Sequence, residues 1–115
     1  MMDLPTVPPE VLEEIVRRIA RVADPDKIIL FGSAARGEKG PHGDLDFLVI
    51  KSDVGHRGRL TEEIYMNLFG IAQAVDVIVA TPEDVERYRH AHPTVFKPAM
   101  REGKVVYERG VSGAR

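Results

Sequence analysis

Two aspartates separated by one residue, Asp44 and Asp46, are the first candidates for chemistry in this sequence. They open an apolar run, DLDFLVI, that has the composition of a β-strand. Side chains at positions i and i+2 of a strand point to the same face of the sheet, so the two carboxylates lie side by side. Such a pair is costly unless a cation lies between them, and the spacing therefore indicates a metal site. The alternative is a turn residue followed by a solvent-facing strand residue.

A Gly-Ser turn at Gly32 and Ser33 is the second candidate, because it follows the apolar run from Ile28 to Phe31 directly. Glycine permits a tight turn and a close approach of ligand to backbone. Residues 34–36 predict the first turn of a short helix, and helix N-termini bind anions. The turn therefore predicts a small phosphate-binding platform, although Gly-Ser at a strand end is also common in plain turns.

A third acid, Asp76, interrupts the apolar run from Ala74 to Ala80. A carboxylate buried in such a strand is expensive without a partner. The plain explanations are a salt bridge or a position at the edge of the sheet. Three carboxylates beside a phosphate-binding turn suit two magnesium ions, which take hard oxygen ligands and bridge them to phosphates. The sequence contains no cysteine, which excludes disulfides and thiolate metal sites.

The strands that carry these residues must be neighbours for the candidates to act together. Ten residues separate Ser33 from Asp44, fewer than a parallel crossover needs, so the first two strands should pair antiparallel. A helix from Arg59 to about Ile71 separates the second strand from the third, which favours parallel pairing through a right-handed connection. The phosphate platform and the acids therefore converge on one sheet.

The remaining segments predict more helices and one more strand. An apolar stripe from Val11 to Val22 has helical spacing and predicts an amphipathic helix that packs on the core. Thr81 is a suitable N-cap for a further helix, and residues 93–102 predict a last one. Lys104 to Tyr107 has the composition of an edge strand.

These elements predict an α/β (α+β) fold, in which a small mixed β-sheet is flanked by helices. A chain of 115 residues suits one domain, which we place at residues 11–108. Residues 1–10 are proline-rich and predict an extended lead-in, and residues 109–115 predict a mobile tail.

The composition narrows the class of partner. No apolar run approaches the roughly 18 residues of a membrane-spanning helix, and the N-terminus lacks the pattern of a signal peptide. We therefore expect a cytoplasmic protein with no membrane partner. A net charge of −2 argues against a nucleic-acid partner, because such proteins normally carry a positive excess.

The combined motif is Gly32-Ser33, ten residues, Asp44-Leu45-Asp46, and a later Asp76. It resembles the active-site signature of polymerase-beta-like nucleotidyltransferases. The segments FGSAARG and DLDFLVI, on so short a chain, most resemble the minimal nucleotidyltransferases (MNT) of that superfamily, over Ile28 to Glu108. Many relatives carry serine where this chain has Gly43, but that position is not a metal ligand.

The resemblance implies a role for each residue of the motif. Asp44, Asp46 and Asp76 would be the catalytic acids and would hold two Mg²⁺ ions. Asp76 would also help to deprotonate the acceptor.

The resemblance also implies how ATP or another nucleoside triphosphate would bind. Gly32 and Ser33 would hold the terminal phosphates, and Arg36 would neutralise charge on the pyrophosphate leaving group. Arg36 is equally suited to a surface ion pair with Glu38. His42, in the loop before the acids, suits either a nucleotide contact or a plain exposed position.

The acceptor is expected to come from a separate protein, because the sequence leaves no segment for a second domain. Minimal members commonly pair with a small helical HEPN-type protein as toxin and antitoxin, and some transfer AMP to a tyrosine of that partner. The leading interpretation is therefore a magnesium-dependent protein adenylyltransferase that acts as an antitoxin. Two alternatives stay open: a non-catalytic nucleotide-binding or steric antitoxin, and transfer to a small molecule or a nucleic acid end.

Overall fold

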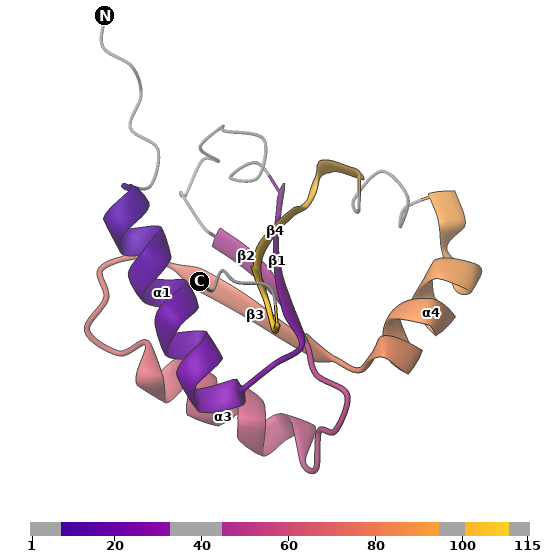
Figure 1. Ribbon diagram of the computed structural model, residues 1–115, viewed down its shortest axis with the longest axis horizontal. Coiled ribbons are helices and arrows are strands. Elements are labelled where there is room, and N and C mark those ends of the chain that lie inside the picture. The colour runs from indigo at the N-terminus through magenta and orange to yellow at the C-terminus, as the bar shows by residue number, and fades with distance from the viewer. Residues whose placement is uncertain (1–7, 33–44, 95–100, 111–115) are drawn as a thin grey trace, which may run out of the picture.

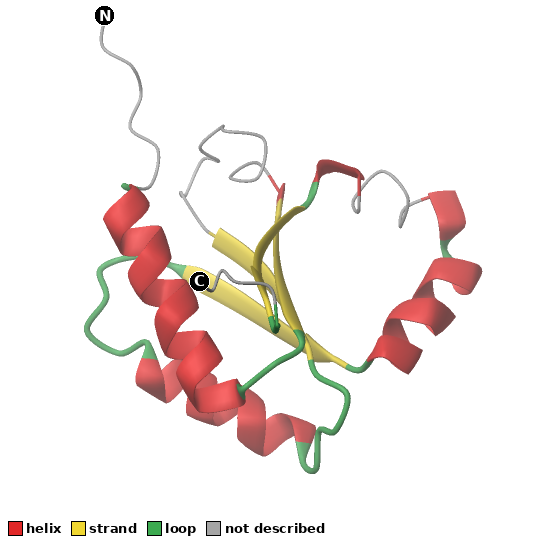
Figure 2. Ribbon diagram, viewed as in Figure 1, coloured by secondary structure: helices red, strands yellow, loops and turns green. Residues whose placement is uncertain are grey.

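A four-stranded mixed sheet forms the centre of the computed structural model, which describes residues 8–32, 45–94 and 101–110. The strands lie in the order β3-β2-β1-β4 (Figure 1). Their bounds are β1 (Lys27–Phe31), β2 (Leu45–Ile50), β3 (Val75–Ala80) and β4 (Lys104–Glu108). The predicted fold class, a small mixed sheet flanked by helices, is confirmed (Figure 2).

The pairing of the strands follows the prediction from connection lengths. β1 pairs antiparallel with β2 on one side and with β4 on the other. β2 and β3 pair parallel, because a helix carries the chain back along the sheet between them. β4 lies at one edge as predicted, and β3 forms the other edge.

The helices cover the two faces of the sheet unequally. Helices α1 (Pro9–Ala23) and α3 (Arg57–Asn67) pack on one face, whereas α4 (Pro82–Ala91) lies on the opposite side, near one end of β3 (Figure 1). The main core lies under α1 and α3 and includes Ile15, Ile19, Ile28, Phe47 and Val49. The described helices therefore leave a part of the second face uncovered.

Prolines and a left-handed residue set the ends of α1. Pro8 occupies the N-cap position and Pro9 the first helical position, where a missing backbone N–H costs nothing. The helix ends at Asp24, whose φ of 49° lies in the left-handed region. The predicted amphipathic helix is confirmed, with Ile15 and Ile19 fully buried.

The bounds of α3 differ from the predicted Arg59 to Ile71 at both ends. The helix begins two residues earlier, because the His56 Nδ1 atom accepts a hydrogen bond of 3.0 Å from the backbone N–H of Arg59. It ends at Asn67, and Gly70 then turns the chain with a φ of 94°. Ile71 still packs against the core, from the loop that follows.

The start of α4 is a capping box. The hydroxyl of Thr81 accepts from the backbone N–H of Asp84, and the Asp84 carboxylate accepts from the N–H of Thr81, each at 3.0 Å. The predicted N-cap at Thr81 is confirmed. The predicted last helix, the lead-in and the tail lie partly outside the described residues. None of the described helices is long and apolar enough to cross a bilayer.

Candidate active site

Asp46 and Asp76 are direct register partners on the parallel strands β2 and β3. Partners in adjacent parallel strands point to the same side of the sheet. Both side chains project from the face of the sheet that is turned away from α1 and α3, which we call the open face. Leu48 and Ile78 project from the same face. The structure therefore brings two of the three predicted acids together.

Gly32 lies directly beside the first of these acids. Phe31, the last residue of β1, is the register partner of Asp46, and the chain turns immediately afterwards. Gly32 adopts a φ of 77°, a conformation that L side chains rarely adopt. A Cβ atom at this position would lie 2.9 Å from the Oδ2 atom of Asp46. The turn thus requires glycine both for its backbone and for the space beside the carboxylate.

Of the two plain explanations for Asp76, the structure shows the position at the edge of the sheet, because Asp76 lies on the edge strand β3. β3 buries Val77 and Val79 against the core, but Asp76 is exposed and Ile78 keeps 63% of its surface exposed. The physical reason is that β3 is an edge strand and α4 covers only the far end of its second face. Asp76 therefore pays little desolvation penalty, and its position beside Asp46 is what makes it a candidate ligand.

Three predicted site residues, Ser33, Arg36 and Asp44, lie outside the described residues. Within residues 8–32, 45–94 and 101–110 no group of three acids or histidines is arranged to hold a metal. The two carboxylates that are described fit a divalent cation such as Mg²⁺ by donor type, because they offer hard oxygens from neighbouring strands at an accessible face. The space beside Asp46 that a Cβ would fill is consistent with that fit.

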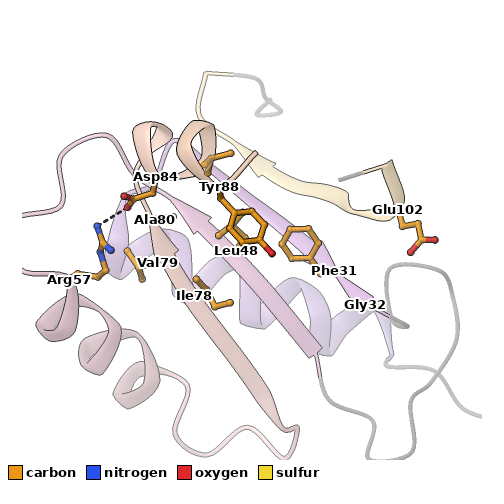
Figure 3. A pocket seen from close by; sticks show the side chains of 11 residues that line it. Phe31, Gly32, Leu48, Arg57, Ile78, Val79, Ala80, Asp84, Tyr88 and Glu102 are labelled. Atoms are coloured by element: carbon orange, nitrogen blue, oxygen red, sulfur yellow. Dashed lines mark hydrogen bonds and ion pairs between the residues drawn. The ribbon is translucent and has the colours of Figure 1, made fainter. Parts of the chain in front are cut away.

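An apolar groove, which no sequence motif indicated, runs along the open face from Gly32 and Phe31, the neighbours of Asp46. Its volume is about 550 Å³, and its described lining includes Gly32, Phe31, Leu48, Ile78, Val85 and Tyr88 (Figure 3). The alternation of side chains along a strand could have indicated it. Leu48 and Ile78 lie two residues after Asp46 and Asp76 and therefore share their face of the sheet.

An ion pair ends the groove at the side away from Gly32. The Nη2 atom of Arg57 lies 2.7 Å from Oδ2 of Asp84, which links the start of α3 to the start of α4 (Figure 3). The backbone N–H of Thr81, assisted by Arg87 and Arg57, holds the pKa of Asp84 below its usual value. The carboxylate is therefore ionised at neutral pH, and the pair is maintained.

A tyrosine fixes the edge strand next to its acid. The backbone N–H of Val77 donates a hydrogen bond of 2.8 Å to the Oη atom of Tyr65 on α3. This N–H belongs to the residue directly after Asp76, on the side of β3 that has no neighbouring strand. Tyr65 therefore ties the backbone at the second acid to the helix layer.

The comparisons with known proteins agree with this arrangement. A family model described as "Polymerase beta, Nucleotidyltransferase" matches residues 13–111. One similar solved structure is that of a "putative nucleotidyltransferase" from Sulfolobus solfataricus, with a TM-score of 0.58 and 19% identity. That match covers 87% of this chain and 79% of the other. Among curated proteins, no sequence matches the chain significantly.

The chain belongs to the polymerase beta nucleotidyltransferase family, because the family model covers most of its length. This assigns it to the transferases that move nucleotidyl groups, a class that generally uses a nucleoside triphosphate and a divalent metal. The Sulfolobus structure supports the same fold.

Proposed function

We propose that this protein is a minimal nucleotidyltransferase that moves AMP from ATP to a tyrosine hydroxyl of a HEPN-type partner and thereby acts as its antitoxin. The observation that carries the proposal is the register pairing of Asp46 with Asp76 on the open face, beside the turn at Gly32. The membership of the chain in the polymerase beta nucleotidyltransferase family supports the same proposal.

The carboxylates of Asp46 and Asp76, together with Asp44, would hold two magnesium ions in this proposal. When bound, magnesium neutralises the triphosphate and lowers the pKa of the attacking hydroxyl. The protein itself then has mainly to position the reactants and to stabilise charge.

The reaction forms one bond and breaks another at the α-phosphorus of ATP. The acceptor oxygen attacks that phosphorus, the bond to the bridging oxygen breaks, and pyrophosphate leaves. Asp76 accepts the hydroxyl proton and passes it to solvent, which its exposure permits. Gly32 lets the backbone approach the phosphates closely, and Ser33 and Arg36 would complete the phosphate site.

The proposal is tested by co-expressing the chain with a HEPN-type protein. The complex is then incubated with Mg²⁺ and ATP labelled at the α-phosphate. We expect label on a tyrosine of the partner, located by mass spectrometry, and none when the metal is chelated.

Asp46→Asn should abolish the transfer, whereas Asp53→Asn, which removes an exposed carboxylate from the loop after β2, should leave it unchanged. Undiminished transfer by Asp46→Asn would contradict the two-metal assignment. Partner binding without any label, in the unaltered protein and in both variants, would identify a steric antitoxin instead.

A further inference from the structure

We propose that the apolar groove on the open face holds the base and ribose of the nucleoside triphosphate. This inference rests on the proposed function, because it takes the phosphates to lie at the turn beside Gly32. The groove begins at that glycine, whose ideal Cβ position lies 2.9 Å from the Asp46 carboxylate. The phosphate end and the groove are therefore continuous.

Strand geometry sets the length of the groove. Ile78 and Ala80, which line the groove, follow Asp76 along the same face of β3, and about 13 Å of strand separates Asp76 from Ala80. Its volume of about 550 Å³ lies within the range of small-molecule sites, roughly 300–1,000 Å³. These dimensions suit one nucleoside.

The lining selects a flat, uncharged group over a phosphate. Aliphatic side chains form much of the wall, and the rings of Phe31 and Tyr88 lie over it (Figure 3). Among its described lining residues Arg57 is the single cation, and Asp84 already pairs with it. Aromatic rings beside an apolar floor favour stacking of a nucleobase.

The far end of the groove supplies polar groups for the edge of a base. The guanidinium of Arg57 carries five N–H donors, and the ion pair with Asp84 occupies only a part of them. Acceptor atoms on a base edge can receive the others.

The experiment compares the binding of ATP with that of inorganic tripolyphosphate by calorimetry, in the presence of Mg²⁺ and without any partner. Tripolyphosphate offers the phosphates but no base. Ile78→Trp fills the groove at an exposed position, so the fold should tolerate the larger side chain. Met66→Trp is the matched control, because Met66 is 73% exposed and lies on α3, away from the open face.

We expect Ile78→Trp to weaken ATP binding about tenfold or more while tripolyphosphate binds as before. Tyr88→Ala should act in the same direction by removing an aromatic wall, and Met66→Trp should change neither ligand. Equal changes for both ligands, or none for ATP, would overturn the inference. So would intact ATP binding with lost transfer to the partner, because the groove would then hold the acceptor.

The outcomes also separate this inference from the function on which it rests. If the unaltered protein binds neither ATP nor tripolyphosphate in the presence of Mg²⁺, the proposed function and the base site are both contradicted. If the unaltered protein binds both ligands and transfers AMP, but Ile78→Trp leaves the affinity for ATP unchanged, only the base site is contradicted.

Discussion

Asp46 and Asp76 face the same side of the sheet at the same level, yet their strands differ in support. Asp46 lies on β2, which has a hydrogen-bonded neighbour on each side, whereas Asp76 lies on the edge strand β3. One acid of the pair therefore has a fixed backbone, and the other depends on Tyr65 for its second support.

The carboxylate pair should destabilise the metal-free protein. Adjacent like charges repel, so Asp76→Asn should raise the free energy of unfolding by about 0.5 kcal/mol at neutral pH. We also expect Mg²⁺ to raise the melting temperature of the unaltered protein, and Asp76→Asn should abolish that rise. Thermal denaturation with and without Mg²⁺ tests both points. If Asp76→Asn retains the full Mg²⁺-dependent rise, Asp76 is not a ligand.

Gly32→Ala should weaken ATP binding by more than its effect on the stability of the fold can explain. The left-handed backbone costs roughly 1–2 kcal/mol for alanine, and the new Cβ would also displace the Asp46 carboxylate. Gly70→Ala is a matched control, because Gly70 has a φ of 94° with no atom within 4 Å of its Cβ position. Urea denaturation should show comparable losses, whereas ATP binding should fall only for Gly32→Ala. An equal fall in both variants would contradict the crowding argument.

Tyr65→Phe should loosen β3 without altering the core. The change leaves the Val77 N–H without its acceptor and should cost about 0.5–1.5 kcal/mol. Hydrogen exchange of the Val77 amide should accelerate, and the Mg²⁺ concentration needed for half-maximal activity should rise. Tyr107→Phe is the control, because it removes a tyrosine hydroxyl from β4 instead of α3 and should affect neither quantity. Unchanged exchange at Val77 would show that this bond does not hold the strand.

Asp26 should make the stability of the fold sensitive to acid. The hydroxyl of Ser52, together with its backbone N–H and the charge of Arg109, holds the pKa of Asp26 below the usual 3.8. A lowered pKa means that this stabilisation is complete above the unfolded value and is lost as pH falls through the folded one. Asp26→Asn should flatten the decline in stability between about pH 5 and pH 2. Ser52→Ala should flatten it partly, and a slope unchanged in both would contradict the assignment.

Much of the sheet could be predicted because connection length restricts pairing. The short link between Ser33 and Asp44 excludes a crossover, and the helix before β3 permits one. The same reasoning placed the Gly-Ser turn beside the acids, and the position of Gly32 next to Asp46 agrees with it.

The edge position of β3, the start of α3 and the groove could not be predicted from local sequence patterns. The apolar run around Asp76 left a salt bridge and an edge position open, and only the strand order shows that the strand is an edge. The start of α3 was missed because histidine is not among the usual N-cap residues. The groove depends on α4 leaving a part of the open face uncovered, which is a tertiary property.

The parallel pairing of β2 with β3 also has a kinetic consequence. The segment that connects β2 to β3 includes the whole of α3. The entropy cost of closing this long connection must be met before the pairing of Asp76 with Asp46 can stabilise the chain. The hairpin of β1 and β2, which brings Gly32 to Asp46, closes a shorter loop. We therefore expect the site to assemble in two stages during folding, with Asp46 beside its glycine before Asp76 arrives. Pulse-labelled amide exchange should show protection in β2 before β3.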